Sequence, residues 1–88
     1  MIFITLSKFR KKPTKEMTAE VTNITRALAE KGVKIISFYW TLGRYDTVVI
    51  MDAPDEKAAM KANIMVGDIV STETLVGVQR EEAIKLVS

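Results

Sequence analysis

The chain has 88 residues, of which 48% are hydrophobic and 27% are charged, and its formal net charge at pH 7 is +2. This length suits a single domain, residues 1–88, because domains commonly run to about 100 to 150 residues. The sequence contains neither cysteine nor histidine, which excludes disulfides, thiolate nucleophiles, the usual zinc sites, histidine-ligated haem and histidine general bases. We therefore expect no cofactor and no metal.

The start of the chain, Met1 to Thr5, has no charged lead-in and no long apolar run, which argues against a signal peptide. No segment approaches the roughly 18 to 20 apolar residues that a membrane span requires. We expect a soluble, cytoplasmic protein without a membrane partner, and the absence of disulfides fits that reducing compartment. Because so small a domain buries a limited share of its surface, a partner subunit is the remaining way to enlarge its core.

The first strand is predicted over residues 2–9, where β-branched and aromatic side chains predominate. Thr14 has a hydroxyl that can cap the helix that follows. Gly32 supplies the left-handed end of that helix. The apolar face of the helix is formed at steps of four, three and four residues by Met17, Val21, Ile24 and Leu28.

A second strand is predicted over residues 33–42. Strict alternation places Tyr39 and Trp40 on opposite faces, one toward a helix-side core and the other on the second face. The full alternation sets Ile35, Ser37, Tyr39 and Thr41 against Ile36, Phe38, Trp40 and Leu42. A turn follows, in which Gly43 takes a positive φ and the Asp46 carboxylate accepts hydrogen bonds from turn amides.

The third strand, residues 47–53, is an unbroken apolar stretch that is typical of a central strand covered on both faces. Pro54 or Asp55 opens a second helix, which Gly67 ends. The fourth strand, residues 70–79, again alternates.

The order strand, helix, strand, strand, helix, strand predicts an α+β fold, the ferredoxin-like βαββαβ sandwich with antiparallel sheet order 4-1-3-2 and both helices on one face. Residues 80–88 form an amphipathic, helical tail with Ile84 and either Val87 or Leu86 as docking points. Two helices cover only one face of the sheet, whereas both faces carry large apolar side chains. We therefore expect a homodimer in which two sheets meet face to face.

Residues 37–46, SFYWTLGRYD, closely resemble the GYD domain family, small proteins of the dimeric α/β-barrel group that are named for a Gly-x-Tyr-Asp turn. Residues 51–55 and 72–75 also look like that family, so the resemblance covers nearly the whole chain. The departures are local, chiefly the basic segment 8–15. The resemblance implies the fold and a dimeric α/β barrel formed through the sheet face, and it implies no particular biochemical role.

The same hairpin also resembles the effector domain of the feast/famine (leucine-responsive) regulators, which bind amino acids at subunit interfaces. No helix-turn-helix pattern precedes it in this sequence. This second resemblance therefore implies a stand-alone amino-acid sensor.

We expect a small molecule to bind in a cleft between the sheet and the helices, and the predicted ligand contacts are Tyr39, Thr41, Tyr45, Asp46 and Glu73. Asp46 and Glu73 also have plainer, structural interpretations. Asp46 serves the hairpin alone, while Glu73 is a solvated edge residue or forms a weak ion pair with Lys8 or Arg44.

Two other kinds of function stay open beside such a ligand-binding module. One is a cofactor-free enzyme, an isomerase or monooxygenase of the kind found in other dimeric α/β-barrel families, in which Asp46 or Glu73 moves a proton and Tyr39 orients the substrate. The other is a structural assembly subunit without a pocket. The sequence pairs no nucleophile with a base, which favours binding over catalysis.

Basic side chains crowd the first loop and the helix start, at Lys8, Arg10, Lys11, Lys12 and Lys15. A solvated loop is one interpretation, and an RNA- or anion-binding patch is the other. Ferredoxin-like sheets that bind RNA display aromatic and basic side chains on their central strands. Residues 47–51, TVVIM, have neither, so nucleic acid is not an expected partner.

Overall fold

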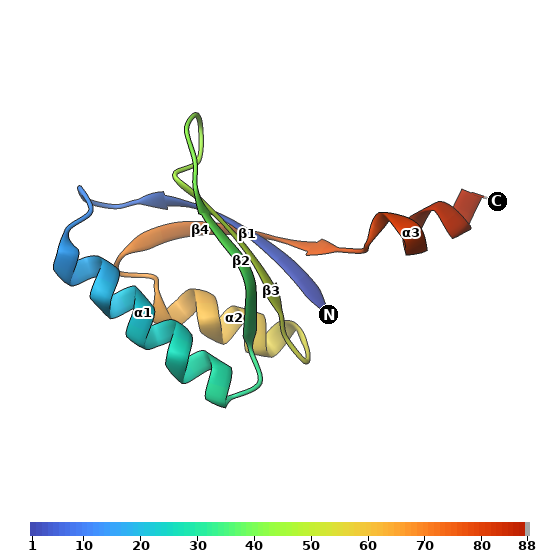
Figure 1. Cartoon of the computed structure of the whole chain (residues 1–88), viewed down its shortest axis with the longest axis horizontal. Helices are drawn as coiled ribbons and strands as arrows, with labels where there is room; N and C mark the ends of the chain where they lie inside the picture. Colours follow the sequence, from blue (N-terminus) through green and yellow to red (C-terminus); the bar gives the residue numbers. More distant parts are fainter. Residues whose placement is uncertain (88) are drawn as a thin grey trace.

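In the computed structural model, which describes residues 1–87, the elements follow the predicted order. They are β1 (Ile2–Phe9), α1 (Lys15–Glu30), β2 (Lys34–Trp40), β3 (Thr47–Asp52), α2 (Glu56–Met65), β4 (Val70–Gly77) and α3 (Arg80–Ala83), which the 3-10 turn η1 (Ile84–Val87) extends (Figure 1). The predicted strand ranges are right to within two residues at each end.

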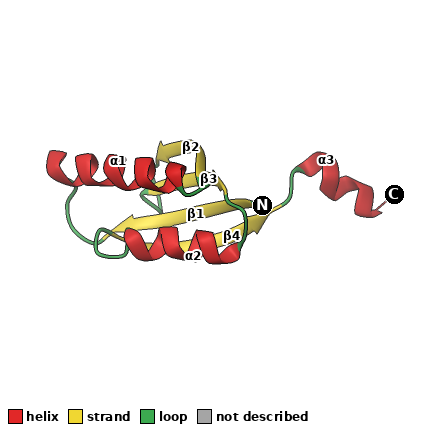
Figure 2. Cartoon of the chain, turned by 90° about the horizontal axis from the view of Figure 1, so that it is seen from below, coloured by secondary structure: helices red, strands yellow, loops and turns green. Residues whose placement is uncertain are grey.

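The four strands form one antiparallel sheet in the order β2-β3-β1-β4. This is the predicted order 4-1-3-2 counted from the other edge, so the ferredoxin-like α+β fold is confirmed. Helices α1 and α2 lie side by side on one face of the sheet (Figures 1 and 2). Within residues 1–87, no helix lies over the opposite face, which we call the open face (Figures 1 and 2). Within the single chain the helices cover β3 on one face only, and the cover expected on its other face, from a partner sheet, stays a prediction.

Each long helix begins at a residue whose side chain satisfies an amide of the first turn. The Thr14 hydroxyl accepts a hydrogen bond from the Met17 amide at 3.1 Å, and the Asp55 carboxylate accepts one from the Ala58 amide at 2.9 Å. These amides have no partner inside the helix, so the caps stabilise the two starts. After α1, Gly32 has a φ of +87°, as predicted for the left-handed end of the helix.

An extra residue in β2 changes which of its side chains face the helices. Ile35 and Ser37 pair with consecutive residues of β3, so Ile36 forms a β-bulge between them. Ile35 packs against the buried core, on the helix side with Trp40, and no longer shares the face of Tyr39. The predicted alternation was wrong at Ile35 because one inserted residue inverts the face. The opposite orientation of Tyr39 and Trp40, beyond the bulge, is as predicted.

The buried core fills only part of the space between sheet and helices. Its largest members, Phe3 and Met51 on the central strands and Leu28 on α1, meet at one end of the sheet. The fully buried residues of α2 are the small Ala59 and Ala62, and the half-buried Met65 packs against the same core. Small side chains leave space beside them, so the rest of the layer between sheet and helices is not filled by this core.

Helix α3 and the η1 turn continue away from the body beyond the end of β4 in both ribbon views (Figures 1 and 2). The longest dimension of the chain is accordingly 48 Å, against 32 and 17 Å for the other two. In residues 1–87, no helix combines the length and the apolar character that crossing a membrane requires.

Candidate ligand site

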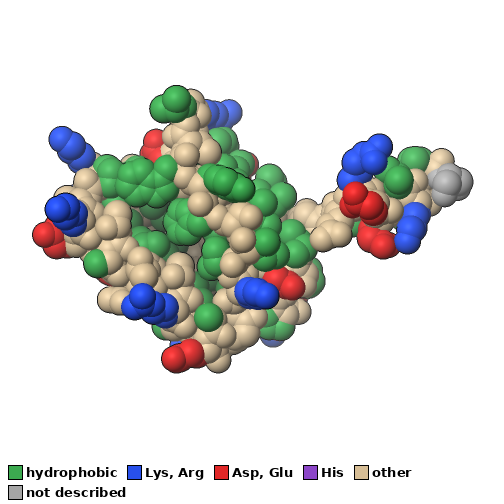
Figure 3. All heavy atoms as spheres, in the orientation of Figure 1, with side chains coloured by type: hydrophobic (Ala, Val, Ile, Leu, Met, Phe, Trp, Pro, Cys, Tyr) green, Lys and Arg blue, Asp and Glu red, His purple; other side chains and the backbone are tan. Residues whose placement is uncertain are grey.

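A cavity of about 330 Å³ lies between α1 and the helix-facing side of the sheet. Figure 3 shows the hollow, with hydrophobic side chains around it. Its walls are largely apolar and include Val21 and Ile24 of α1 and Phe38 and Trp40 of β2. Three α1 threonines also line it, with hydroxyls that donate to carbonyls of their own helix: Thr18, Thr22 and Thr25. The cavity is thus enclosed by the part of the sandwich that the core leaves unfilled.

The floor of the cavity is a set of hydroxyls on three neighbouring strands. Thr47 of β3, Ser7 of β1 and Thr72 of β4 lie side by side in the strand register, and Thr5 lies in the next row. The Ser7 and Thr47 hydroxyls form a hydrogen bond with each other. Thr5, Ser7 and Thr47 are 3 to 5% exposed, so these polar groups are buried beneath the helices.

The second row of hydroxyls is connected to α2. The Thr5 hydroxyl shares a hydrogen bond of 2.9 Å with the Thr74 hydroxyl, to which the Asn63 side-chain amide donates at 2.7 Å. Buried hydroxyls require such partners, because an unpaired polar group in an apolar interior costs about 1–3 kcal/mol. The network holds the floor in place and ties α2 to β4.

The floor retains hydrogen-bonding capacity for a bound molecule. Two hydroxyls that share one hydrogen bond use one of their two hydrogens on each other, so each pair keeps one donor. Within residues 1–87, the Thr72 side chain makes no hydrogen bond. None of the described lining residues is ionisable. The site therefore offers uncharged donors and acceptors at the base of an apolar chamber.

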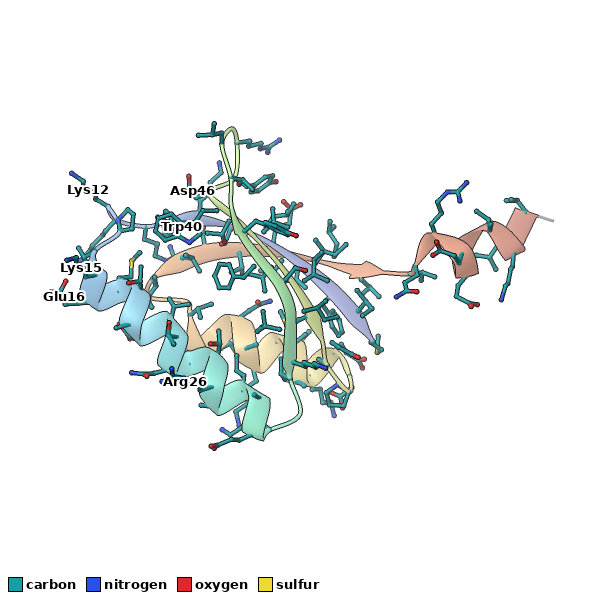
Figure 4. The ribbon with its side chains drawn as sticks, viewed as in Figure 1. Lys12, Lys15, Glu16, Arg26, Trp40 and Asp46 are labelled. Atoms are coloured by element: carbon teal, nitrogen blue, oxygen red, sulfur yellow. The ribbon has the colours of Figure 1, made fainter. Side chains whose placement is uncertain are left out.

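Two aromatic rings stand at one end of the cavity. Phe9 and Trp40 both line it, and their ring centroids lie 5.2 Å apart at an interplanar angle of 67°, an edge-to-face pair. Figure 4 shows Trp40 on the side of β2 toward the start of α1. It is 58% exposed and is the single tryptophan of the sequence. Trp40 is thus a natural reporter of what enters the cavity.

None of the five predicted ligand contacts lines this cavity. Tyr39 and Glu73 share one row of the open face, on the outer strands β2 and β4. Thr41, Tyr45 and Asp46 belong to the hairpin between β2 and β3. The prediction that these five residues line the cleft between the sheet and the helices is therefore wrong. That they contact a ligand elsewhere stays a prediction.

Comparison with protein families and solved structures places these features in context. The GYD domain model matches residues 1–87. The chain belongs to the GYD domain family. Among solved structures, TTHA0845 from Thermus thermophilus matches with a TM-score of 0.54 and 20% identity, covering 89% of this chain and 92% of that one.

An AsnC family transcriptional regulator from Agrobacterium tumefaciens also matches this GYD domain, with a TM-score of 0.54 and 15% identity. The match covers 90% of this chain and 52% of the regulator, so the GYD domain corresponds to about half of that protein. At these identities the two likenesses show the fold alone. Comparison with curated proteins gave no match.

The turn that characterises the GYD domain fastens the β2–β3 hairpin to β1. Gly43 has a φ of +104°, as predicted. The Asp46 amide donates to the Ser7 carbonyl and the Asp46 carboxylate accepts from the Phe9 amide, both at 2.8 Å (Figure 4). The expectation that this carboxylate binds turn amides was wrong, because it extends the β1–β3 ladder instead, in the place of a strand carbonyl.

Tyr45 and Glu73 form a polar contact near one edge of the open face. The Tyr45 hydroxyl donates to Glu73 Oε2 at 2.5 Å. The Tyr45 ring centroid lies 5.5 Å from the Arg44 guanidinium and 5.8 Å from the Lys8 ammonium. The hydrogen bond to Glu73 raises the pKa of Tyr45 above its ordinary value of 10.0, with a smaller contribution from burial, while Arg44 opposes the shift. Glu73 thus pairs with Tyr45, and no ion pair joins it to Lys8 or Arg44 in the described part of the chain.

One member of the basic segment has a structural role in this GYD domain. The Arg10 side chain donates to the Gly67 carbonyl at 2.6 Å, and the Arg10 amide donates to the Ile69 carbonyl at 3.0 Å. These contacts join the end of β1 to the connection between α2 and β4. Lys12 and Lys15 are exposed around the start of α1 (Figure 4), in agreement with a solvated loop.

Sequence reasoning missed the hydroxyl floor, which consists of Thr5, Ser7, Thr47 and Thr72. A signal was present: Thr5 and Ser7 alternate on the same side of β1 as the apolar Phe3, and two other strands place hydroxyls near the matching end. This signal can be recognised only when the register between strands is known, and the paired hydroxyls lie about forty to seventy residues apart in sequence.

Proposed function

We propose that this GYD domain binds a small, uncharged and largely apolar molecule in the cavity between its sheet and α1. The observation that supports the proposal is the uncharged hydroxyl floor beneath apolar walls. Binding pockets typically combine apolar linings with a few polar groups that fix orientation, and their volumes run from about 300 to 1,000 Å³. A cavity of about 330 Å³ suits a compact ligand at the small end of that range.

The lining selects against charged ligands. Moving a carboxylate or an ammonium group from water into a site without a counter-charge costs several kcal/mol, and no lining residue supplies one. A ligand carbonyl or hydroxyl, by contrast, can accept from the free hydroxyl hydrogen of Thr72 or of the Ser7–Thr47 pair. We therefore favour a neutral carbonyl compound or alcohol over a free amino acid.

The same lining favours binding over proton-transfer catalysis. Asp46 and Glu73, the carboxylates considered as acid or base, lie outside the cavity and are held by Phe9 and Tyr45 respectively. A general base must lie within hydrogen-bond reach of the proton it removes. An enzyme acting through either carboxylate would need a second site outside this cavity.

The test combines thermal shift with Trp40 fluorescence. Neutral aliphatic and aromatic ketones and alcohols, matched carboxylates, and amino acids are titrated into the intact domain. We expect stabilisation and a change in Trp40 emission only with neutral compounds. A response confined to amino acids or carboxylates, or no response from any neutral compound, would refute the proposal.

A matched pair of variants locates the site. Thr72→Val removes a lining hydroxyl but keeps the side-chain shape, and Ser71→Ala removes the neighbouring hydroxyl, which does not line the cavity. We expect Thr72→Val to weaken binding of a carbonyl ligand about two- to tenfold, the usual net effect of one hydrogen bond. Ser71→Ala should leave the affinity unchanged.

We further propose that the domain forms a homodimer through the open face. Ile4, Leu6, Val48 and Ile50 occupy the two central strands of this face, and on the outer strands Tyr39 is 59% and Leu75 46% exposed. A contiguous apolar patch of this kind marks an interaction surface. Sedimentation should give a dimer at micromolar concentration, and a monomeric mass would contradict it.

We also propose the cytoplasm as the compartment of this domain, which the absence of cysteine from the sequence supports.

A further inference from the structure

The last ten described residues, 78–87, form a segment that we call the C-terminal arm. It extends along the direction of β4 away from the body (Figures 1 and 2). Leu86 and Val87 are 83% and 88% exposed, and Val78 and Ile84 are also exposed. The arm therefore presents apolar side chains to solvent, as the open face does.

The arm is too short to be stable by itself. Isolated helices below about 12 to 15 residues are marginal in water, whereas α3 and η1 contain four residues each. Two contacts of the helical turn lie within the arm: the Ala83 amide donates to the Gln79 carbonyl at 2.9 Å, and Lys85 pairs with Glu82 at 3.2 Å. An exposed pair of this spacing contributes only about 0.2–0.5 kcal/mol. A helical arm consequently needs a packing surface outside its own body.

We propose that the C-terminal arm of one copy packs against a second copy at the margin of its open face, along the outer strands beside the contact between the two sheets, and that the two arms are exchanged about a two-fold axis. The inference rests on the sheet-face dimer proposed above. Each chain has one uncovered arm and one uncovered face, and a two-fold contact satisfies both pairs at once because residue i meets residue j and j meets i.

The face itself is limited in extent, since four strands spaced ~4.8 Å apart and about seven residues long, at ~3.3 Å per residue, cover ~450 Å² in projection. Its accessible surface is larger than this projection because the side chains give it relief. Stable interfaces bury about 800 Å² of accessible surface on each partner. The arm adds apolar surface from Val78, Ile84, Leu86 and Val87 to what the face alone provides.

The charge of the arm also fits the open face. Arg80 and Lys85 balance Glu81 and Glu82, so the arm has no net charge and no preference for a polyanion. A nucleic acid or an anionic membrane would be attracted by a cluster of basic residues. An uncharged aliphatic face is the better match for such a segment.

The first experiment measures dimer dissociation in the full chain by sedimentation over a range of concentrations. We expect the double variant Leu86→Glu/Val87→Glu to raise the dissociation constant about tenfold or more. The control, Glu81→Gln, changes an exposed polar residue of the same arm and should have no effect. An unchanged dissociation constant in the double variant would overturn the exchanged arm while leaving the sheet-face dimer intact.

The second experiment asks which copy the arm contacts. Because the sequence contains no cysteine, only the introduced cysteines can react with the cross-linker. A tagged chain with Leu86→Cys is mixed with an untagged chain carrying Tyr39→Cys or Leu75→Cys, and a flexible bismaleimide is added. We expect a mixed, tagged-to-untagged product. A link that forms only inside one chain of a double-cysteine variant shows that the arm folds back on its own sheet, and it overturns the inference. A monomeric wild-type chain overturns both the arm exchange and the dimer.

Discussion

The two faces of the sheet differ in a way that is opposite to simple expectation. The face beneath the helices carries the hydroxyls of Thr5, Ser7 and Thr47, which are buried. The open face carries aliphatic side chains, among them Ile4 and Ile50 on the central strands. In this domain buried hydroxyls lie beneath the helices beside the apolar core, whereas in the described residues no helix lies over the aliphatic side chains of the open face.

The difference between the two faces matches the two proposals made above for this sheet. Buried hydroxyls cost stability unless they are paired, and cavities cost packing energy; the proposed ligand site would account for both on the helix-facing side. The proposed dimer would cover the exposed apolar surface of the open face. Three predictions test this division, from the largest expected effect to the smallest.

The helix-facing side should depend most on the residue that anchors α1. Leu28 is 4% exposed and belongs to the buried core. We expect Leu28→Ala to lower the free energy of unfolding by about 2–5 kcal/mol, through lost burial and a new cavity, as measured by urea denaturation.

The matched control on the open face is Leu75→Ala, with a side chain that is 46% exposed. At a protein concentration low enough to keep the chain monomeric, its cost should be below about 1 kcal/mol. Equal losses for the two variants would show that the faces do not differ in the way described.

Removing the hydrogen bond by which the Asp46 carboxylate joins the β2–β3 hairpin to β1 should lower the free energy of unfolding by an intermediate amount. Asp46→Ala leaves the Phe9 amide without its acceptor, and we expect a loss of about 1–3 kcal/mol in unfolding free energy. Asp46→Asn keeps an acceptor oxygen and should lose clearly less. If both variants are as stable as the wild type, the structural role of Asp46 is wrong and its prediction as a ligand contact gains weight.

The smallest expected effect is on the pKa of Tyr45, whose hydroxyl donates a hydrogen bond to Glu73 near the edge of the open face. In a Tyr39→Phe background, absorbance of the remaining phenolate should titrate above pH 10, because Glu73 stabilises the protonated form of Tyr45 in the folded chain. Glu73→Gln should lower that pKa. The folded state holds the proton more tightly, so the contribution to stability is present below pH about 10 and is lost as pH rises through the raised pKa. An identical titration in both proteins would contradict the contact.

Much of the fold was predictable because its signals are local. The cap at Thr14, the positive φ of Gly32 and Gly43, and the strand alternation all depend on residues within a few positions of each other. The candidate site was less predictable. Four of the five predicted contacts lie near the GRYD turn in sequence and the fifth, Glu73, lies on β4, yet the cavity is formed elsewhere, by α1, β2 and hydroxyls on three strands.

The sequence by itself determined the order of the elements and their limits to within a few residues, because periodicity, caps and turn chemistry depend on adjacent residues; the family followed from the resemblance of residues 37–46 to the GYD domain. Only the tertiary structure decided which face is hollow. That outcome depends on the bulge at Ile36, which returns Ile35 to the helix side, and on the register that brings Ser7 beside Thr47. Strand register is set by contacts between residues distant in sequence, and a shift of one residue exchanges the two faces.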